Sequence, residues 1–120
     1  MKIFERIYAD FLMPKKFDEY KNILEYGIKE GYKFMSVLDY YKNYYNKNTN
    51  TKIIILKHDI DSDLRGTKNF FEIEKELNVK ATYYFRLNTI DYNLMDKIIE
   101  YGSEVGYHYE ELATYSKKTR

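Results

Sequence analysis

The stretch IIILKHDID, at residues 53–61, carries the strongest structural signal in the sequence. Its first four residues form an unbroken apolar run, which is typical of a strand buried on both faces in a parallel sheet covered by helices. The polar residues 57–61 follow this run directly. We therefore expect residues 53–56 to form the first central strand of the domain, with residues 57–61 just past its carboxyl end.

Two later segments continue the pattern. Residues 81–85 (ATYYF) and 104–108 (EVGYH) are also predicted to be strands. The three predicted strands begin 28 and 23 residues apart, which matches the length of a strand plus its crossover helix. The fold class is therefore predicted to be α/β, built from right-handed βαβ units. In such folds ligands bind at the carboxyl ends of the parallel strands.

Helical periodicity fills the segments between these strands. The first predicted helix lies between residues 62 and 78, and the second lies between residues 91 and 102. Their inward faces are expected to be Leu64, Phe70, Ile73 and Leu77 in the first helix, and Leu94, Ile98 and Tyr101 in the second. The expected capping residues are Ser62 or Asp63 and Asp91 or Asn93 at the starts, and Asn78 and Gly102 at the ends.

The first half of the chain carries a separate set of predicted elements. Its expected elements are a helix over residues 16–30 that ends at Gly31, a short strand over 32–35 and a helical piece over 37–45. Residues 46–51 are polar and turn-like. We predict that residues 1–50 form an N-terminal extension packed on a domain that occupies residues 51–120.

The composition excludes several classes of protein. The chain has 120 residues with 44% hydrophobic residues, which suits one folded domain with one core. No apolar run approaches the roughly 18 residues of a membrane-spanning helix, and a net charge of +1 disfavours nucleic acid as a partner. The chain has no cysteine, and Glu5 and Asp10 interrupt the segment where a signal peptide would be apolar. We expect a cytoplasmic protein without disulfides, thiolate metal sites or membrane contact.

Two carboxylates are expected to lie close together in residues 53–61. Because side chains alternate along a strand, Asp59 and Asp61 fall on one face and His58 falls on the other. Adjacent carboxylates repel each other unless a cation or a shared proton lies between them. The less specific interpretation is that Asp-x-Asp forms only a turn and a helix cap.

The third predicted strand adds an imidazole and two further carboxylates at the same edge of the sheet. These are His108, Glu110 and Glu111. Taken singly, His108 is more often a hydrogen-bonded interior histidine, and the two glutamates more often begin a solvated helix. Taken together with the two aspartates, they predict a divalent-metal site at the ends of the strands.

Three runs of sequence resemble one known family. The runs LKHDID (residues 56–61), LNVKATYYFR (77–86) and YGSEVGYHYE (101–110) resemble the divergent polysaccharide deacetylases of the NodB-homology group, carbohydrate esterase family 4. The resemblance covers about residues 53–112. It implies a partial (β/α) barrel with an N-terminal helical extension, and a metal-dependent hydrolase that removes acetyl groups from N-acetylated sugars.

The resemblance also implies roles for single residues. Asp59 would be the general base that activates a water at the metal, and Asp61 would be a metal ligand. His108 matches the first of two histidine ligands, with zinc as the favoured ion because an imidazole suits it. The second histidine position is Leu112, which cannot bind a metal. Either Glu110 or Glu111 substitutes for it, a solvent molecule takes its place, or the site is not a working metal site. Independently of the resemblance, the place of Arg86 at the end of the second predicted strand makes it either an electrostatic partner for the carboxylates or a surface arginine.

The chain departs from that family in length, because the later strands and motifs have no counterpart after residue 120. This predicts a truncated copy with an uncovered sheet edge, which invites self-association. Two alternatives remain open. An apolar strand followed by Asp59 also looks like the signature of haloacid dehalogenase-like phosphatases, in which that aspartate attacks phosphorus. The chain could also be a non-catalytic remnant or a binding module.

Overall fold

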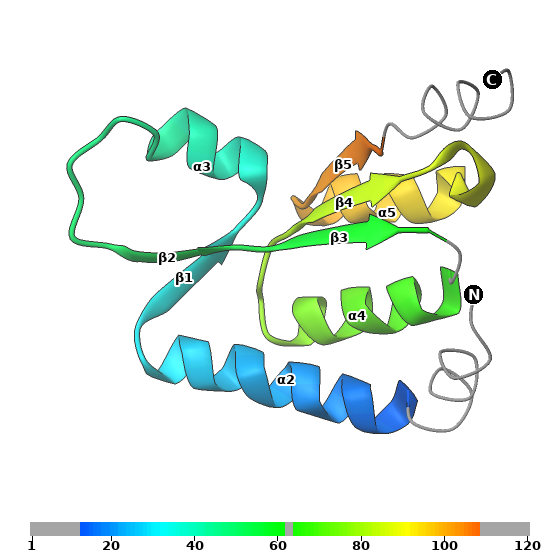
Figure 1. Cartoon of the computed structure of the whole chain (residues 1–120), viewed down its shortest axis with the longest axis horizontal. Coiled ribbons are helices and arrows are strands. Elements are labelled where there is room, and N and C mark those ends of the chain that lie inside the picture. Colours follow the sequence, from blue (N-terminus) through cyan, green and yellow to red (C-terminus); the bar gives the residue numbers. More distant parts are fainter. Residues whose placement is uncertain (1–12, 62–63, 109–120) are drawn as a thin grey trace, which may run out of the picture.

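Helices and strands alternate along the chain, except that β2 is followed directly by β3 (Figure 1). The structure, a computed structural model, describes residues 13–61 and 64–108. Its elements in order are α2 (Met13–Lys29), β1 (Tyr32–Met35), α3 (Val37–Asn43), β2 (Lys52–Ile55), β3 (Lys57–Ile60), α4 (Leu64–Glu76), β4 (Thr82–Phe85), a 3-10 turn (Leu87–Thr89), α5 (Tyr92–Tyr101) and β5 (Glu104–Tyr107). The α/β class is therefore correct. The described strands form small parallel sheets and no closed barrel.

The first central strand differs from the prediction. The residues that follow the apolar run do not lie past its end, because they form a second strand, β3, after a break at Leu56. The amide of Leu56 donates to the carbonyl of Met35 at 3.0 Å, and its carbonyl accepts from the amide of Thr82 at 2.9 Å. Leu56 thus joins the β1–β2 pair to the β3–β4–β5 sheet. Asp59 consequently lies inside a strand. The sequence did not indicate this strand, because it is half-exposed and carries no continuous apolar run.

The three-stranded sheet is parallel throughout, in the order β3–β4–β5. Ile60 is paired with Phe85, and Phe85 is paired with Tyr107, so the last residues of the three strands form one row across the sheet. The predicted strands 81–85 and 104–108 are each observed one residue shorter. The spacing argument for parallel strand–helix–strand units is therefore confirmed.

Local signals set the helix ends. Gly31 and Gly102 have φ angles of +85° and +101°, in the left-handed region that favours glycine, and they follow α2 and α5. Asn78, with φ of +56°, follows α4. Of the two candidate caps for α5, Asp91 is the one used, since its carboxylate accepts from the amide of Leu94 at 3.1 Å. The predicted caps Ser62 and Asp63 lie outside the described residues.

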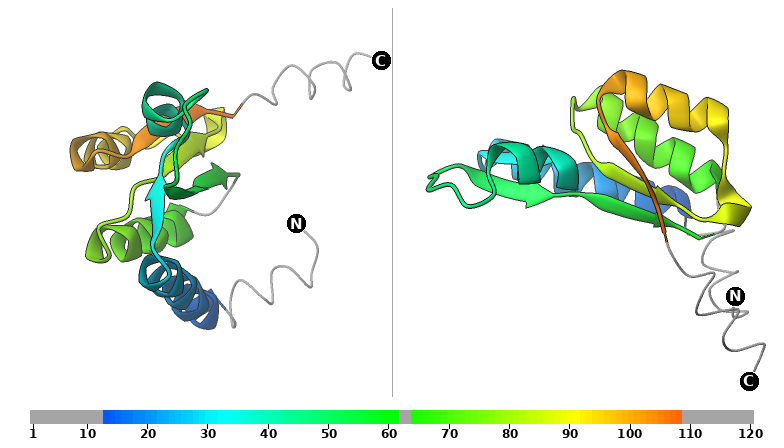
Figure 2. Two further views of the ribbon diagram at one scale, coloured as in Figure 1. Left: turned by 90° about the vertical axis from the view of Figure 1, so that its left-hand side faces the viewer. Right: turned by 90° about the horizontal axis from the view of Figure 1, so that it is seen from above.

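Helices α4 and α5 lie on one face of the three-stranded sheet, and α2 lies beyond α4 (Figure 2). The main core between sheet and helices consists of Ile60, Phe71, Ala81, Tyr83, Phe85, Leu94 and Ile98. A second cluster of Leu24, Phe34 and Val79 fills the space between α2 and β1. The predicted inward residues Leu94 and Ile98 of α5 are buried, as expected.

The predicted face of α4 is confirmed in part. Its buried residues are Gly66, Thr67, Phe71 and Glu74, whereas Leu64, Phe70, Ile73 and Leu77 are only half-buried. Leu64 nevertheless packs against the main core, and Ile73 and Leu77 pack against the second cluster. Phe70 instead makes edge-to-face contacts with Phe17 and Tyr20 of α2, at ring-centroid distances of 5.0 and 4.8 Å.

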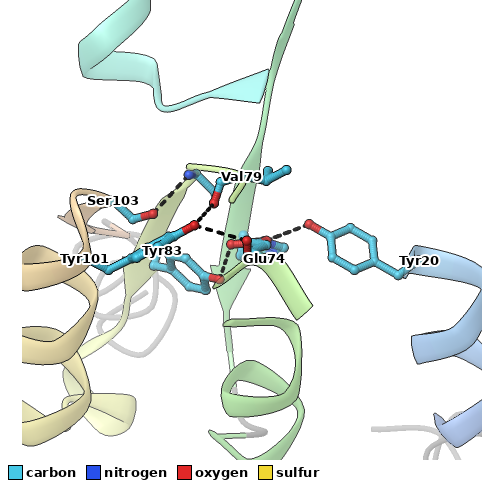
Figure 3. A network of polar contacts seen from close by, with 8 residues as sticks. Tyr20, Glu74, Val79, Tyr83, Tyr101 and Ser103 are labelled. Atoms are coloured by element: carbon cyan, nitrogen blue, oxygen red, sulfur yellow. Dashed lines mark hydrogen bonds and ion pairs between the residues drawn. The ribbon is translucent and has the colours of Figure 1, made fainter. Parts of the chain in front are cut away.

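A buried carboxylate on α4 contacts side chains from three other elements (Figure 3). Glu74 is 0% exposed and accepts hydrogen bonds from the hydroxyl of Tyr20, at 2.6 Å, and from the hydroxyl of Tyr83. The ring nitrogen Nε2 of His58 lies 2.5 Å from its Oε2. These partners come from α2, β4 and β3. A buried carboxylate needs such partners, because an unpaired one would carry a large desolvation cost.

This network predicts an alkaline limit to stability. Burial raises the pKa of the Tyr83 hydroxyl far above its usual value, and the nearby Glu74 carboxylate raises it further. Because the folded pKa exceeds the unfolded pKa of about 10, the stabilisation is complete below about pH 10 and falls as the pH rises, by about 1.4 kcal/mol per pH unit for each such tyrosine. Urea unfolding at a series of pH values should show a shallower decline for Tyr83→Phe than for the wild type. Equal slopes would contradict this description of the network.

Candidate functional site

Three polar side chains stand directly past the ends of the three strands. Asp61 follows β3, Arg86 follows β4 and His108 follows β5. Since the preceding residues form one row across the sheet, these three residues form the next row, which we call the site row. The amide of His108 donates to the carbonyl of Phe85 at 2.8 Å, so the parallel ladder extends into this row.

The side chains of the site row converge on one carboxylate oxygen. Oδ1 of Asp61 lies 3.5 Å from Nδ1 of His108 and 3.9 Å from Nη1 of Arg86. The Asp61 side chain is 59% exposed, whereas those of His108 and Arg86 are 26% and 25% exposed. An accessible carboxylate is thus held beside a half-buried imidazole and a half-buried guanidinium. The structure brings together the sequence-predicted residues Asp61, His108 and Arg86.

Asp59 lies two residues before Asp61 on β3, so strand alternation places it on the same face of the sheet. Its carboxylate is 39% exposed and lies 3.3 Å from Nζ of Lys57. An exposed ion pair of this kind contributes little to stability. Asp59 is therefore reachable from solvent and is not committed to a structural role.

His58 occupies the opposite face. It contacts Glu74 and stacks beside Tyr83, with ring centroids 4.6 Å apart. The expectation that strand alternation turns His58 away from Asp61 is confirmed. His58 belongs to the core network rather than to the site row.

The other predicted ligands cannot be placed. Glu110, Glu111 and Leu112 lie outside the described residues, so the substitute for a second histidine stays a prediction. Within residues 13–61 and 64–108, no cluster of three or more histidine, cysteine, aspartate or glutamate side chains could hold a metal ion.

The two donors that are present nevertheless suit a borderline divalent ion. A tetrahedral site with bonds of about 2.05 Å separates neighbouring donor atoms by about 3.4 Å. The 3.5 Å between Oδ1 of Asp61 and Nδ1 of His108 is close to that value. One carboxylate oxygen and one imidazole nitrogen are ligands that Zn²⁺ takes readily. These residues fit two positions of a metal site and leave the others to further groups.

Sequence reasoning missed two residues on this face, Tyr84 and Gly106. Tyr84 is paired in register with Asp59, and Gly106 is paired with Tyr84. The alternation rule that grouped Asp59 with Asp61 also groups Tyr84 with Arg86 and Gly106 with His108. Applied to all three strands, that rule would have located them.

Comparison of the chain with protein-family models, curated proteins and solved structures found no significant match. Across the part of the chain that the structure describes, none of the helices has both the length and the apolar character needed to cross a lipid bilayer.

The geometry of the site row predicts which side chains control zinc affinity. Asp61→Asn and His108→Ala should each weaken zinc binding at least about tenfold, because loss of a direct ligand exceeds the effect of altering an outer-shell partner. Asp96→Asn, on the exposed surface of α5, is the matched control and should leave the affinity unchanged. Calorimetric titration of each protein with zinc measures the effect. Equally weak zinc binding by the wild type and Asp61→Asn would show that the two residues do not form a metal site.

Proposed function

We propose that the chain is a metal-dependent hydrolase of the polysaccharide-deacetylase type, which removes acetyl groups from N-acetylated sugars. The observation that carries the proposal is the 3.5 Å approach of Asp61 and His108 at the carboxyl ends of adjacent parallel strands. The order of the three resembling runs supports it, since Asp61 ends the first run, Arg86 ends the second and His108 lies near the end of the third.

The residues divide the chemistry between them. Asp61 and His108 would hold a divalent ion, zinc by preference, which when bound acts as a Lewis acid toward water and an amide carbonyl. Asp59, on the same face and open to solvent, would accept the proton of the attacking water as general base. Arg86 would balance the negative charge of Asp61, whose Oδ1 it approaches to 3.9 Å.

The proposed fold is the opening part of a (β/α) barrel. Strands β3, β4 and β5 with helices α4 and α5 on one face would be its first units, and residues before β2 would be an N-terminal extension. The proposed location is the cytoplasm, since a chain without cysteine needs no oxidising compartment.

One observation favours a non-catalytic alternative. The Asp61 carboxylate already has two cationic or hydrogen-bonding neighbours, Arg86 and His108, and the three side chains could serve only as an ion-pair cluster that holds the strand ends together. In that case a divalent ion would have no affinity for the site row.

The decisive variant for turnover is Asp59→Asn. It should lower acetate release from N-acetylated chitooligosaccharides by about 10²–10⁴-fold, the usual contribution of a general base, while zinc affinity stays at the wild-type value. Asp96→Asn again serves as the control. Unchanged acetate release would remove Asp59 from the reaction. A phosphoaspartate-analogue adduct of beryllium fluoride on Asp59 would instead favour the phosphatase alternative.

A further inference from the structure

A second row of residues lies beside the site row. Asp59, Tyr84 and Gly106 are paired across β3, β4 and β5, and each lies two residues before its counterpart in the site row. Strand alternation therefore places both rows on the same face of the sheet, one behind the other. We call this second row the platform row.

The platform row has an aromatic ring where a side chain of β5 would stand. A Cβ atom added at Gly106 would lie 2.6 Å from both Cδ1 and Cε1 of Tyr84, far closer than real contacts allow. The edge of the Tyr84 ring thus occupies the space of the absent side chain. Glycine at 106 is required by this close approach, because any larger residue would push the ring away.

Tyr84 differs sharply from its sequence neighbour. Tyr83 points into the core, where it is fully buried and donates to Glu74. Tyr84 is half-buried on the other face, and Nζ of Lys57 on β3 lies over its ring, 5.8 Å from the ring centroid. Lys57 is also the ion-pair partner of Asp59. The ring is therefore bordered by a cation and a carboxylate on one side and by bare backbone on the other.

We propose that Tyr84 is a sugar-binding platform, on which one pyranose ring of the substrate packs so that its N-acetyl group reaches the site row. The aromatic ring carries negative charge density that attracts the slightly positive C–H groups of a sugar face. Lys57 and Asp59 supply a donor and an acceptor for hydroxyl groups, which matches the mixture of aromatic surface and few polar groups in ligand sites. The inference rests on the proposed function for the class of ligand.

The test uses the 120-residue chain loaded with zinc, and N,N′-diacetylchitobiose as the probe. Tyr84→Leu should weaken sugar binding, measured by calorimetry, by about 2- to 12-fold, the equivalent of about 0.5–1.5 kcal/mol for an aromatic contact. Tyr84→Phe, which keeps the ring, should bind like the wild type. Gly106→Ala should weaken binding as Tyr84→Leu does, because it displaces the ring. Zinc affinity should stay unchanged in all three variants.

The matched control is Tyr92→Leu, which removes a 73% exposed tyrosine from the start of α5. Nuclear Overhauser contacts between the Tyr84 ring protons and the sugar, in the wild type, give a second measurement that needs no variant to fold. An equal effect of Tyr84→Leu and Tyr92→Leu, absence of those contacts in the bound complex, or no sugar binding by the wild type would each overturn the inference. Failure of the hydrolase proposal would appear separately, as sugar binding that depends on Tyr84 without zinc binding at Asp61 and His108.

Discussion

The parallel register of β3, β4 and β5 is the constraint on which the other features depend. Because Ile60, Phe85 and Tyr107 stand in one row, the residue after each of them joins a common row at the carboxyl edge of the sheet. A shift of one residue in either pairing would send the next side chain to the opposite face. The approach of Asp61 and His108 therefore follows from backbone hydrogen bonding rather than from any attraction between the two side chains.

The same alternation gives the three-stranded sheet two different faces, one that packs on the helices and one that carries the site row and the platform row. His58, Ile60, Tyr83 and Phe85 face the helices, where Glu74 satisfies the polar groups among them. The buried Glu74 is costly unless its partners are held in place, so it links the positions of α4, β3 and β4. The face that packs on the helices thereby fixes the position of β3, which contains Asp59 and directly precedes Asp61.

Much of this arrangement was predictable from the sequence. Helical periodicity, glycines at 31 and 102 and the spacing of the apolar strands were sufficient for the order of elements and for the parallel sheet. The proximity of Asp61 and His108 followed from one rule, that polar residues after neighbouring parallel strands meet at one edge. The break at Leu56 was not predictable, because β3 is half-exposed and its charged residues are typical of a loop. Glu74 was missed because a charged residue within a helix usually faces solvent, and its burial is favourable here because Tyr20, Tyr83 and His58 contact its carboxylate.

The most direct test of the central claim uses the two histidines of the chain as reporters, His108 for the site row and His58 for the core network. Long-range ¹H–¹⁵N correlation spectra during a zinc titration distinguish the ring nitrogens of His108 and His58. The account predicts that zinc shifts a ring nitrogen of His108 strongly and leaves those of His58, which is held by Glu74, in place. Zinc binding that leaves His108 unchanged, or that shifts His58 instead, would contradict the assignment of the site row as a metal centre.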